Sequence, residues 1–360
     1  MRALRIHAGP QARRHIAEHG LRPQDIGVVP GAAGGPKGLV LGPLDRFIFG
    51  EWLAQTSQPV HLVGASIGAW RMATACLDNP VAAFERLERD YVVQQFEPEP
   101  GRKWPSAARV SQRFGQNLAD FYGGRIPEVL NHPRYRLHIV TSRGRHILGR
   151  EHRVATPIGY LSAFVANGLH RKALGGWLER VVFSSSTAAG LVPLPFATTD
   201  YPTRQVALSQ DNFQPALQAS CSIPFALQAV HDIPGAPSGA YWDGGLTDYH
   251  LHLAYDRPQG LVLYPHFQRA VVPGWLDKGL RWRHGATPFL DNMVLLAPDP
   301  DWVRALPNGK LPDRNDFGRY GLDLKGRTTA WNSAVASSRQ LADEFGEWLL
   351  RPDLDRIEAL

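Results

Sequence analysis

The sequence has few cysteines and no long apolar run, and both absences exclude classes of protein. Only Cys76 and Cys221 occur, without a C-x-x-C pair, so neither a disulfide framework nor a zinc site is expected. Every apolar run falls short of the ~18–20 residues that a transmembrane helix requires. The first ten residues also lack the continuous apolar segment of a signal peptide, so we expect a cytoplasmic protein.

The composition allows a large hydrophobic core. The chain has 360 residues, 44% of them hydrophobic, with 10 Trp, 10 Tyr and 15 Phe. Two domains are allowed at this length, but no internal repeat, low-complexity tract or clear linker interrupts the sequence. We therefore expect one α/β domain over residues 1–297, with residues 298–360 as an extension whose terminal helix packs on the same domain.

Basic residues outnumber acidic ones, which favours anionic partners. The formal net charge is +6. Such a charge suits either a nucleic acid or a phospholipid surface. No RNA-binding or helix-turn-helix signature accompanies the charge, so no nucleic acid is expected as a partner. Peripheral contact with an anionic membrane surface stays open.

The main motif of the sequence is a serine with a glycine two residues away on each side. Gly64, Ser66 and Gly68 form a G-x-S-x-G pattern. The apolar run 59–63 before it predicts a buried strand, and residues 69–77 after it favour a helix. Strand, motif and helix in this order indicate a nucleophile elbow, in which glycines let strand and helix approach around a strained serine. A purely structural Gly-Ser-Gly turn is the alternative.

A loop of small residues follows the strand predicted at 25–30. Its sequence is Gly31-Ala32-Ala33-Gly34-Gly35-Pro36-Lys37-Gly38, which matches neither a P-loop nor the Rossmann pattern. The N–H groups of Gly34 and Gly35 can converge on an anion, and Lys37 adds a positive charge. A helix predicted at 39–52 completes a βαβ unit. This unit places the loop and Ser66 at the carboxyl ends of neighbouring parallel strands, where α/β sheets bind ligands.

Apolar periodicity predicts the remaining elements. Pro43 requires the helix at 39–52 either to begin near Gly42 or to kink there. Further helices are predicted at 11–22, 81–96, 107–130 and 157–172, with a loop at 97–105. Further strands are predicted at 136–141, 180–183 and 201–209 and within 255–265 and 289–297. We expect residues 298–328 to be irregular and 328–350 to form a helix that buries Trp331, Val335, Leu341, Phe345 and Trp348.

Two later segments carry candidate chemistry. Residues 215–221 predict a small-residue helix that ends before Pro224. At 241–245, Asp243 stands at the end of a short predicted strand, beside Gly244 and Gly245. Asp-Gly-Gly is also a hairpin-turn signal, so a merely structural interpretation stays open here.

Taken together, these segments resemble the patatin-like phospholipases, a family of plant storage acyl hydrolases with many bacterial relatives. Four blocks occur in the family's order: residues 33–38 against its G-G-G-x-[RK]-G oxyanion loop, 64–68 against G-x-S-x-G, 219–224 against A-S-x-A-x-P, and 243–245 against D-G-[GA]. The blocks span residues 33–245 of the chain. Two positions depart from the family: Ala33 replaces the first glycine, and Ser222 stands where alanine is frequent.

The resemblance implies a three-layer α/β fold, with a mainly parallel sheet flanked by helices, and a lipid acyl hydrolase of the phospholipase A or lysophospholipase type. It implies a dyad of Ser66 and Asp243, with an oxyanion site at Gly34, Gly35, Lys37 and Gly38, and it implies neither metal nor cofactor. The substrate would be a lipid ester. Because aspartate is a weak base in water, we expect Asp243 to be buried with a raised pKa.

Other functions stay open at this point. His250, His252, His266 and His284 all follow Asp243, so chain order permits a Ser-His-Asp triad, although the H-G-G-G oxyanion motif is missing. Asp248 with His250 and His252 suggests a metal site, but no further ligand stands at a recognisable spacing. An acyltransferase would use the same acyl-enzyme. A lipid-binding or scaffold protein would keep the fold with little turnover.

The segment 273–284 is rich in tryptophan and arginine. Such a mixture suits a membrane interface, with Trp275 and Trp282 among the headgroups and the cations on anionic lipid. The alternative is a surface helix that packs its tryptophans against the domain.

Overall fold

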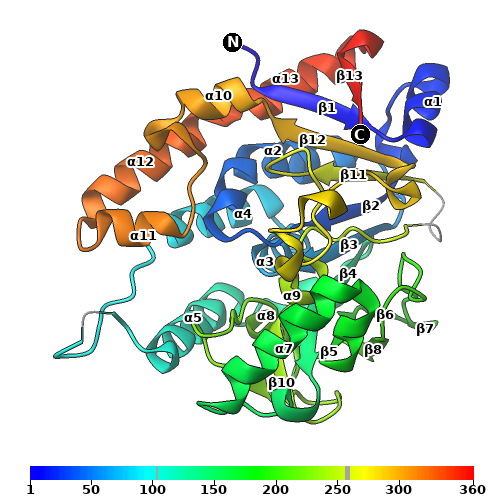
Figure 1. Ribbon diagram of the computed structural model, residues 1–360. Coiled ribbons are helices and arrows are strands. Elements are labelled where there is room, and N and C mark those ends of the chain that lie inside the picture. The colour runs from blue at the N-terminus through cyan, green and yellow to red at the C-terminus, as the bar shows by residue number, and fades with distance from the viewer. Residues whose placement is uncertain (103, 256–259) are drawn as a thin grey trace.

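The computed structural model describes residues 1–102, 104–255 and 260–360, and its centre is a mixed β-sheet. In this part of the chain, eleven strands form one sheet. Nine of them pair in the order β13-β1-β12-β11-β2-β3-β4-β10-β9, while β5 pairs with β4 and β8 pairs with β5. Helices flank the sheet (Figure 1). The prediction of an α/β protein with a mainly parallel central sheet is therefore confirmed.

The central strands are parallel and buried. They are β12 (Met293–Pro298), β11 (Leu261–Pro265), β2 (Ile26–Gly31), β3 (Val60–Ala65) and β4 (Tyr135–Gly144). Their nearly continuous apolar sequences fit burial on both faces of a sheet. The outer strands are β1 (Leu4–Ala8), β5 (Leu178–Ser184), β8 (Thr203–Ala207), β9 (Val230–His231), β10 (Ala240–Asp243) and β13 (Ile357–Ala359). A separate hairpin joins β6 (Ser186–Thr187) to β7 (Gly190–Leu191).

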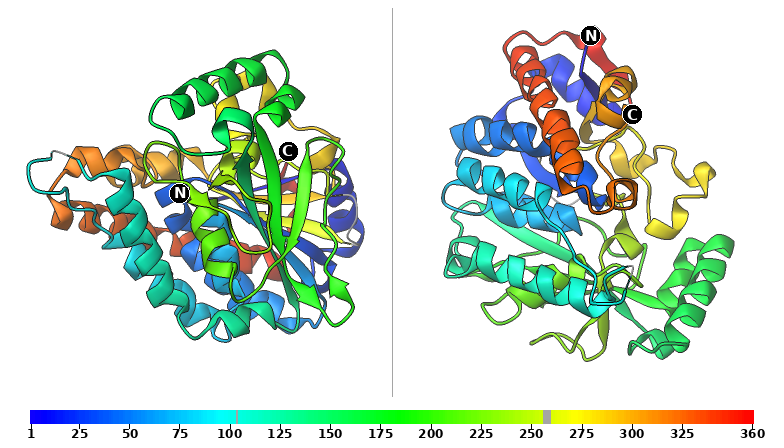
Figure 2. Two further views of the ribbon diagram at one scale, coloured as in Figure 1. Left: turned by 90° about the horizontal axis from the view of Figure 1, so that it is seen from below. Right: turned by 90° about the vertical axis from the view of Figure 1, so that its left-hand side faces the viewer.

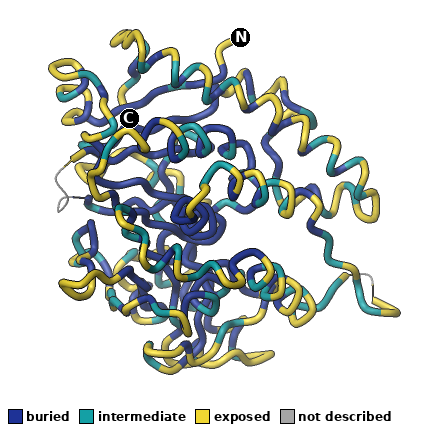
Figure 3. The backbone as a smooth tube through the Cα atoms, turned by 180° about the vertical axis from the view of Figure 1, so that it is seen from behind, coloured by how far each residue is buried: buried dark blue, intermediate teal, exposed yellow. Residues whose placement is uncertain are grey.

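The helices follow the predicted periodicity over most of the chain. They are α1 (Pro10–His19), α2 (Gly42–Phe47), α3 (Ile67–Ala75), α4 (Pro80–Val92), α5 (Ala107–Tyr122), α6 (Ile126–Leu130), α7 (Ala155–Leu169), α8 (Phe213–Ser220), α9 (Gly245–Asp248), α10 (Pro300–Ala305), α11 (Asn315–Tyr320), α12 (Leu324–Ser337) and α13 (Arg339–Leu350). Helix α2 begins at Gly42 with Pro43 in its first turn, so of the two alternatives that Pro43 allowed, a start near Gly42 and a kink, the start is correct. All nine residues of α3 are buried, at the centre of the molecule (Figure 3).

Several predicted boundaries were wrong. The single helix predicted at 107–130 is two, because the chain turns at Gly123 and Gly124, where Gly124 has φ 74°. Residues 298–328 are not irregular: they form α10, α11 and the start of α12, and the Asp299 side chain caps α10. The terminal helix breaks at Ser338. Strands β1 and β13 were missed. Within the strand predicted in 255–265 and the loop predicted at 97–105, residues 256–259 and 103 lie outside the described residues.

The last sixty residues pack on the same sheet as the rest of the chain. The five side chains expected to be buried there, Trp331, Val335, Leu341, Phe345 and Trp348, are all buried. Strand β13 pairs with β1, so the two ends of the chain lie close together (Figure 1). None of the helices in the described ranges is both long enough and apolar enough to span a bilayer.

Candidate active site

Ser66 occupies a sharp turn between β3 and α3. Its backbone has φ 56° and ψ −129°, a conformation that non-glycine residues rarely adopt and that costs energy to hold. The two flanking glycines make this turn possible. A Cβ on Gly68 would lie 1.8 Å from the carbonyl oxygen of Gly31, and a Cβ on Gly64 would lie 2.4 Å from the Cα of Ala69. The G-x-S-x-G segment therefore has the geometry of a nucleophile elbow.

Asp243 ends strand β10 directly beside Ser66. The Ser66 hydroxyl donates a hydrogen bond to Asp243 Oδ2 at 2.7 Å, and the N–H of Gly245 donates to Oδ1 at 2.7 Å. A Cβ on Gly244 would lie 2.1 Å from the carbonyl oxygen of Val140. Because α9 begins at Gly245, Asp-Gly-Gly joins a strand to a helix, and the hairpin interpretation was wrong.

Burial changes the chemistry of this carboxyl group. Asp243 is buried, and desolvation raises its pKa above the ordinary value of 3.8. The hydrogen bond from Ser66, the positive charge of Arg314 and the Gly245 N–H oppose this rise. A raised pKa makes the carboxylate a stronger base than a solvated aspartate, as expected from the sequence.

The strand register explains why these two residues meet. Strand β3 runs parallel to β4 and ends with Ala65 opposite Val140. Strand β10 runs antiparallel to β4 and ends with Asp243 opposite Thr141. Strand β5 pairs with one edge of β4, so β3 and β10 share the opposite edge. The end of β3 meets the end of β10 there. Ser66 and Asp243 lie at this meeting point.

The segment after α8 fixes the backbone on both sides of the dyad. The Ser66 N–H donates to Ser220 Oγ at 2.9 Å, and Ser220 Oγ donates to the carbonyl of Val140 at 2.7 Å. The N–H of Asp243 donates to the carbonyl of Ser222, and that of Gly244 to the carbonyl of Ser220. Ser220 is thus a positioning residue. The sequence pointed to this segment only through the resemblance and gave no role for the hydroxyl.

The glycine loop lies beside the dyad. Gly34 and Lys37 line the same cavity as Ser66 and Asp243. Gly34 and Gly35 stand at the start of a 3-10 turn, Gly35–Leu41, where backbone N–H groups have no acceptor within the turn. The Lys37 ammonium lies 5.2 Å from the ring centre of Phe267, and burial lowers its pKa. The fourth predicted residue, Gly38, faces Ile67 instead of lining that cavity.

The structure does not assemble the alternative centres in the ranges that it describes. The four candidate histidines bond to groups other than Ser66 or Asp243: His250 to the Ala270 carbonyl, His252 to the Val271 carbonyl and Thr287, His266 to the Gln268 carbonyl, and His284 to the Asp277 carbonyl. Within the same ranges, no three His, Cys, Asp or Glu side chains are grouped to hold a metal ion. Asp248 binds Arg180 instead.

Two cavities of different character meet at Ser66. One, of about 220 Å³, is lined by the dyad and by three cationic side chains, Lys37, Lys278 and Arg314. The other, of about 330 Å³, is mostly apolar. Its walls include Trp70, Tyr91, Phe96, Phe114, Ile223 and Phe317. The site can therefore hold an amphiphilic molecule with its polar part in one cavity and its apolar part in the other, since both cavities reach Ser66.

Lys278 and Arg314 are the functional candidates that sequence reasoning missed. Arg314 precedes α11, in a region predicted to be irregular, and its guanidinium lies against Gly35. The Lys278 ammonium stacks on Tyr249, 4.2 Å from the ring centre. Burial, together with the positive charges of Arg314 and Lys37, lowers the pKa of Lys278 to about 8. No local motif marks either residue, because only the folded chain brings them to the dyad.

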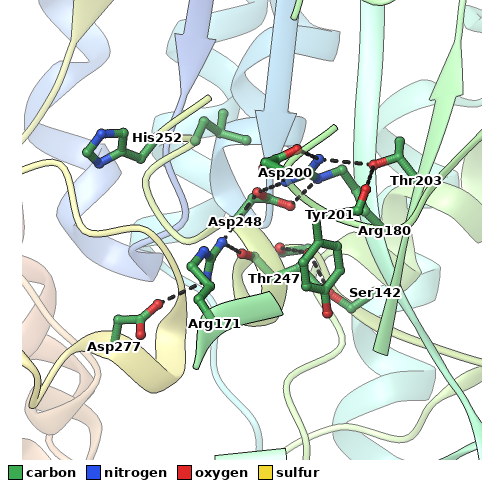
Figure 4. Close-up of polar contacts among 12 residues, drawn as sticks. Ser142, Arg171, Arg180, Asp200, Tyr201, Thr203, Thr247, Asp248, His252 and Asp277 are labelled. Carbon is green, nitrogen blue, oxygen red and sulfur yellow. Dashed lines mark hydrogen bonds and ion pairs between the residues drawn. The ribbon is translucent and has the colours of Figure 1, made fainter. Parts of the chain in front are cut away.

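A buried polar network, which Figure 4 shows, holds the segment that follows Asp243. Ser142 Oγ donates to the backbone carbonyl of Asp243 at 2.9 Å and lies 3.1 Å from Thr247 Oγ1. The fully buried Arg180 makes two bonds of 2.7 Å with Asp248. Since Thr247 and Asp248 belong to α9, the network fixes the helix that follows Asp243 and so the end of β10.

No family model matches the chain, and no curated protein matches it. The function is therefore argued from the geometry of the site.

Proposed function

We propose that this protein is a serine hydrolase that cleaves carboxylic esters of lipids through an acyl-enzyme formed on Ser66. The observation that carries the proposal is the 2.7 Å hydrogen bond from a strained, elbow-mounted serine hydroxyl to a buried carboxylate. This distance lies within the range of direct proton transfer. A serine needs such an adjacent base to attack an ester.

Each proton in the proposed mechanism passes through Asp243. Ser66 Oγ attacks the ester carbonyl carbon while its proton moves to Asp243 Oδ2. The N–H groups of Gly34 and Gly35 stabilise the negative oxygen of the tetrahedral intermediate, and Lys37 adds positive charge nearby. The intermediate collapses, the C–O bond to the alcohol breaks, and the alcohol leaves with the proton from Asp243. Water then attacks the acyl-Ser66 ester while Asp243 takes one proton of the water. The second tetrahedral intermediate collapses, the bond between the acyl carbon and Ser66 Oγ breaks, and Asp243 returns the proton to Oγ as the fatty acid leaves.

The two cavities favour a lipid with an anionic headgroup. An acyl chain fits the apolar walls of the larger cavity, and burying each CH₂ group there contributes about 0.8 kcal/mol. The cations of the smaller cavity suit a phosphate on the alcohol side of the ester. We therefore propose an activity of the phospholipase A or lysophospholipase type.

Labelling with a fluorophosphonate probe tests the nucleophile. The probe should label the wild-type protein and not Ser66→Ala. Ser222→Ala is the matched control, since the Ser222 hydroxyl bonds only to the Gln218 carbonyl among the described residues, and it should label like the wild type. A wild-type protein that stays unlabelled, or Ser66→Ala labelled equally, would refute the proposal. A series of esters with increasing acyl length and with or without a phosphate then tests the substrate class.

A further inference from the structure

The outer face of α7 is apolar, exposed and free of charge. The helix contains no Asp, Glu, Lys or Arg. Its inner face, at Thr156, Tyr160, Ala163 and Asn167, is buried. Six large apolar side chains in or next to it are between 49% and 83% exposed: Val154, Ile158, Leu161, Phe164, Val165 and Leu169. The exposed side of a helix in a globular protein is normally polar, and a contiguous apolar patch marks an interaction surface.

The tryptophan-rich segment extends this surface. Trp282 is 74% exposed and Trp275 is 37% exposed, and the segment 273–284 forms two 3-10 turns, Trp275–Asp277 and Arg281–Arg283. The alternative prediction, a surface helix with packed tryptophans, was therefore wrong. We call the six side chains of α7 together with Trp282 the α7 surface.

One buried carboxylate holds the two parts of the α7 surface together. Asp277 accepts hydrogen bonds from Asn167 of α7, from Arg171 just after it, and from Arg283. The Arg283 guanidinium also donates to the carbonyl of Gly168. Figure 4 shows the Arg171–Asp277 contact. Helix α7 faces the viewer in Figure 1 and lies at the edge of the molecule in both views of Figure 2. The exposed apolar side chains are thus presented on a fixed scaffold.

The charges around the α7 surface select its partner. Residues 145–172 contain five basic residues, Arg145, Arg150, Arg153, Arg171 and Lys172, and one acidic residue, Glu151. The segment 273–284 adds Lys278, Arg281 and Arg283. Arg150 pairs with Asp232, and Arg171 and Arg283 pair with Asp277, so within the described residues the cations of this surround that lie outside an ion pair are Arg145, Arg153, Lys172, Lys278 and Arg281. A second copy of the chain would bring like charges together. An anionic bilayer complements both the apolar centre and the basic surround.

The elements that carry the α7 surface also reach both cavities of the candidate active site. The ring of Phe225 meets Tyr160 of α7 edge-on at 5.8 Å, and Phe225 lines the apolar cavity that reaches Ser66. Trp275 lines the cationic cavity. A bilayer on the α7 surface would therefore lie on the same elements that contact the walls of both cavities.

We infer that the α7 surface docks on an anionic lipid bilayer, with its apolar side chains at the boundary between headgroups and acyl chains and its cations on the lipid phosphates. The inference concerns binding alone, so it stands or falls independently of the proposed ester hydrolysis.

Flotation with vesicles tests the docking. The full-length protein should float with vesicles of phosphatidylcholine containing 30% phosphatidylglycerol, a composition chosen as about that of an anionic membrane. Leu161→Gln/Phe164→Gln should lower the apparent partition coefficient about tenfold or more, because two exposed apolar side chains are lost without a change in charge. Lys172→Gln/Arg281→Gln should lower it by roughly fivefold for each cation lost, on anionic vesicles only.

The matched control changes two leucines elsewhere that are more exposed than Leu161 and Phe164. Leu322 and Leu350 are 82% and 84% exposed, and Leu322→Gln/Leu350→Gln should bind as the wild type does. Trp282→Ala, outside α7, is a second variant that should also weaken binding. It tests the inference if circular dichroism shows that the α7 variant does not fold. The inference is overturned if the wild type does not float, if both Leu161→Gln/Phe164→Gln and Trp282→Ala bind as well as the wild type, or if the wild type is a dimer that the α7 variant dissociates.

Discussion

Replacing Asp243 by asparagine should abolish most activity while leaving the fold intact. The asparagine side chain has the shape of the aspartate, but it has one acceptor oxygen in place of two, so it keeps either the bond from Ser66 or the bond from Gly245, and it cannot take the proton. General-base catalysis contributes about 10²–10⁴ in rate. We expect kcat to fall about 10³-fold, which corresponds to about 4 kcal/mol of transition-state stabilisation, with KM nearly unchanged.

The pH dependence gives a second measure of the same group. Burial raises the pKa of Asp243 above 3.8, and the reaction needs the deprotonated form. The activity of the wild type should therefore fall as pH decreases, and this fall should occur at a higher pH than the titration of a solvated aspartate. A raised folded-state pKa contributes stability below the unfolded pKa, and this contribution is lost as pH rises through the folded pKa. At pH 7 the asparagine variant is free of the cost of this buried charge, which offsets the loss of one of the two hydrogen bonds.

Initial rates on a chromogenic ester, with urea unfolding as the control for folding, measure these effects. The double variant Ser66→Ala/Asp243→Asn should be as slow as Ser66→Ala alone, because the two groups act as one unit. Full activity in Asp243→Asn would refute the dyad. An alanine replacement at His250 that removed turnover without unfolding the protein would favour a histidine base instead.

Two further predictions concern the strain at the elbow and the cationic cavity. Ser66→Gly should have a free energy of unfolding about 1 kcal/mol higher than Ser66→Ala, because glycine adopts the φ of 56° without strain; equal values in urea titrations would contradict strain at this turn. Since the pKa of Lys278 is about 8, KM for a phosphate-bearing ester should rise as pH rises through that value. KM for a neutral ester should not change with pH, and KM of Lys278→Gln should not change with pH for either ester. If KM of the variant still changed with pH, a group other than Lys278 would be responsible.

Local sequence predicted the βαβ unit because its signals are local. The strand before Ser66, the glycine pair at Gly64 and Gly68 and the late start of α2 at Pro43 each follow from the steric properties of neighbouring residues. The burial of Asp243 and its raised pKa were expected on chemical grounds and agree with the structure. These features could be read from the chain because each depends on few residues.

The errors in the C-terminal part have a different cause. Residues 298–328 are rich in Pro, Gly and Asp, which suggested irregular structure. Asp299 and Asp323 are instead helix caps, at the starts of α10 and α12, and Pro300 occupies the first turn of α10, where proline is tolerated. These capping signals were present in the sequence. Lys278 and Arg314 carry no such signal, because their role depends only on what the fold places beside them.

The apolar face of α7 shows the same limit of local information. Periodicity placed a helix there and marked residues as apolar, but it could not decide which of two apolar faces would be covered. Tyr160 is covered by Trp242, with ring centres 5.8 Å apart, whereas Leu161 on the other side is 65% exposed. Exposure is a property of the packed chain.

The distance between Ser66 and Asp243 depends on a register that no motif contains. Strand β10 is held to β4 by three residue pairs, among them Trp242 opposite Ser142. Since side chains alternate along a strand, a slip of one residue would turn Asp243 away from Ser66. The buried Trp242 and the bond from Ser142 to the Asp243 carbonyl both favour the observed register. A chain could thus keep all four blocks and still lack an assembled dyad, which is why the sequence predicted the participants but only the packed sheet brings them within 2.7 Å.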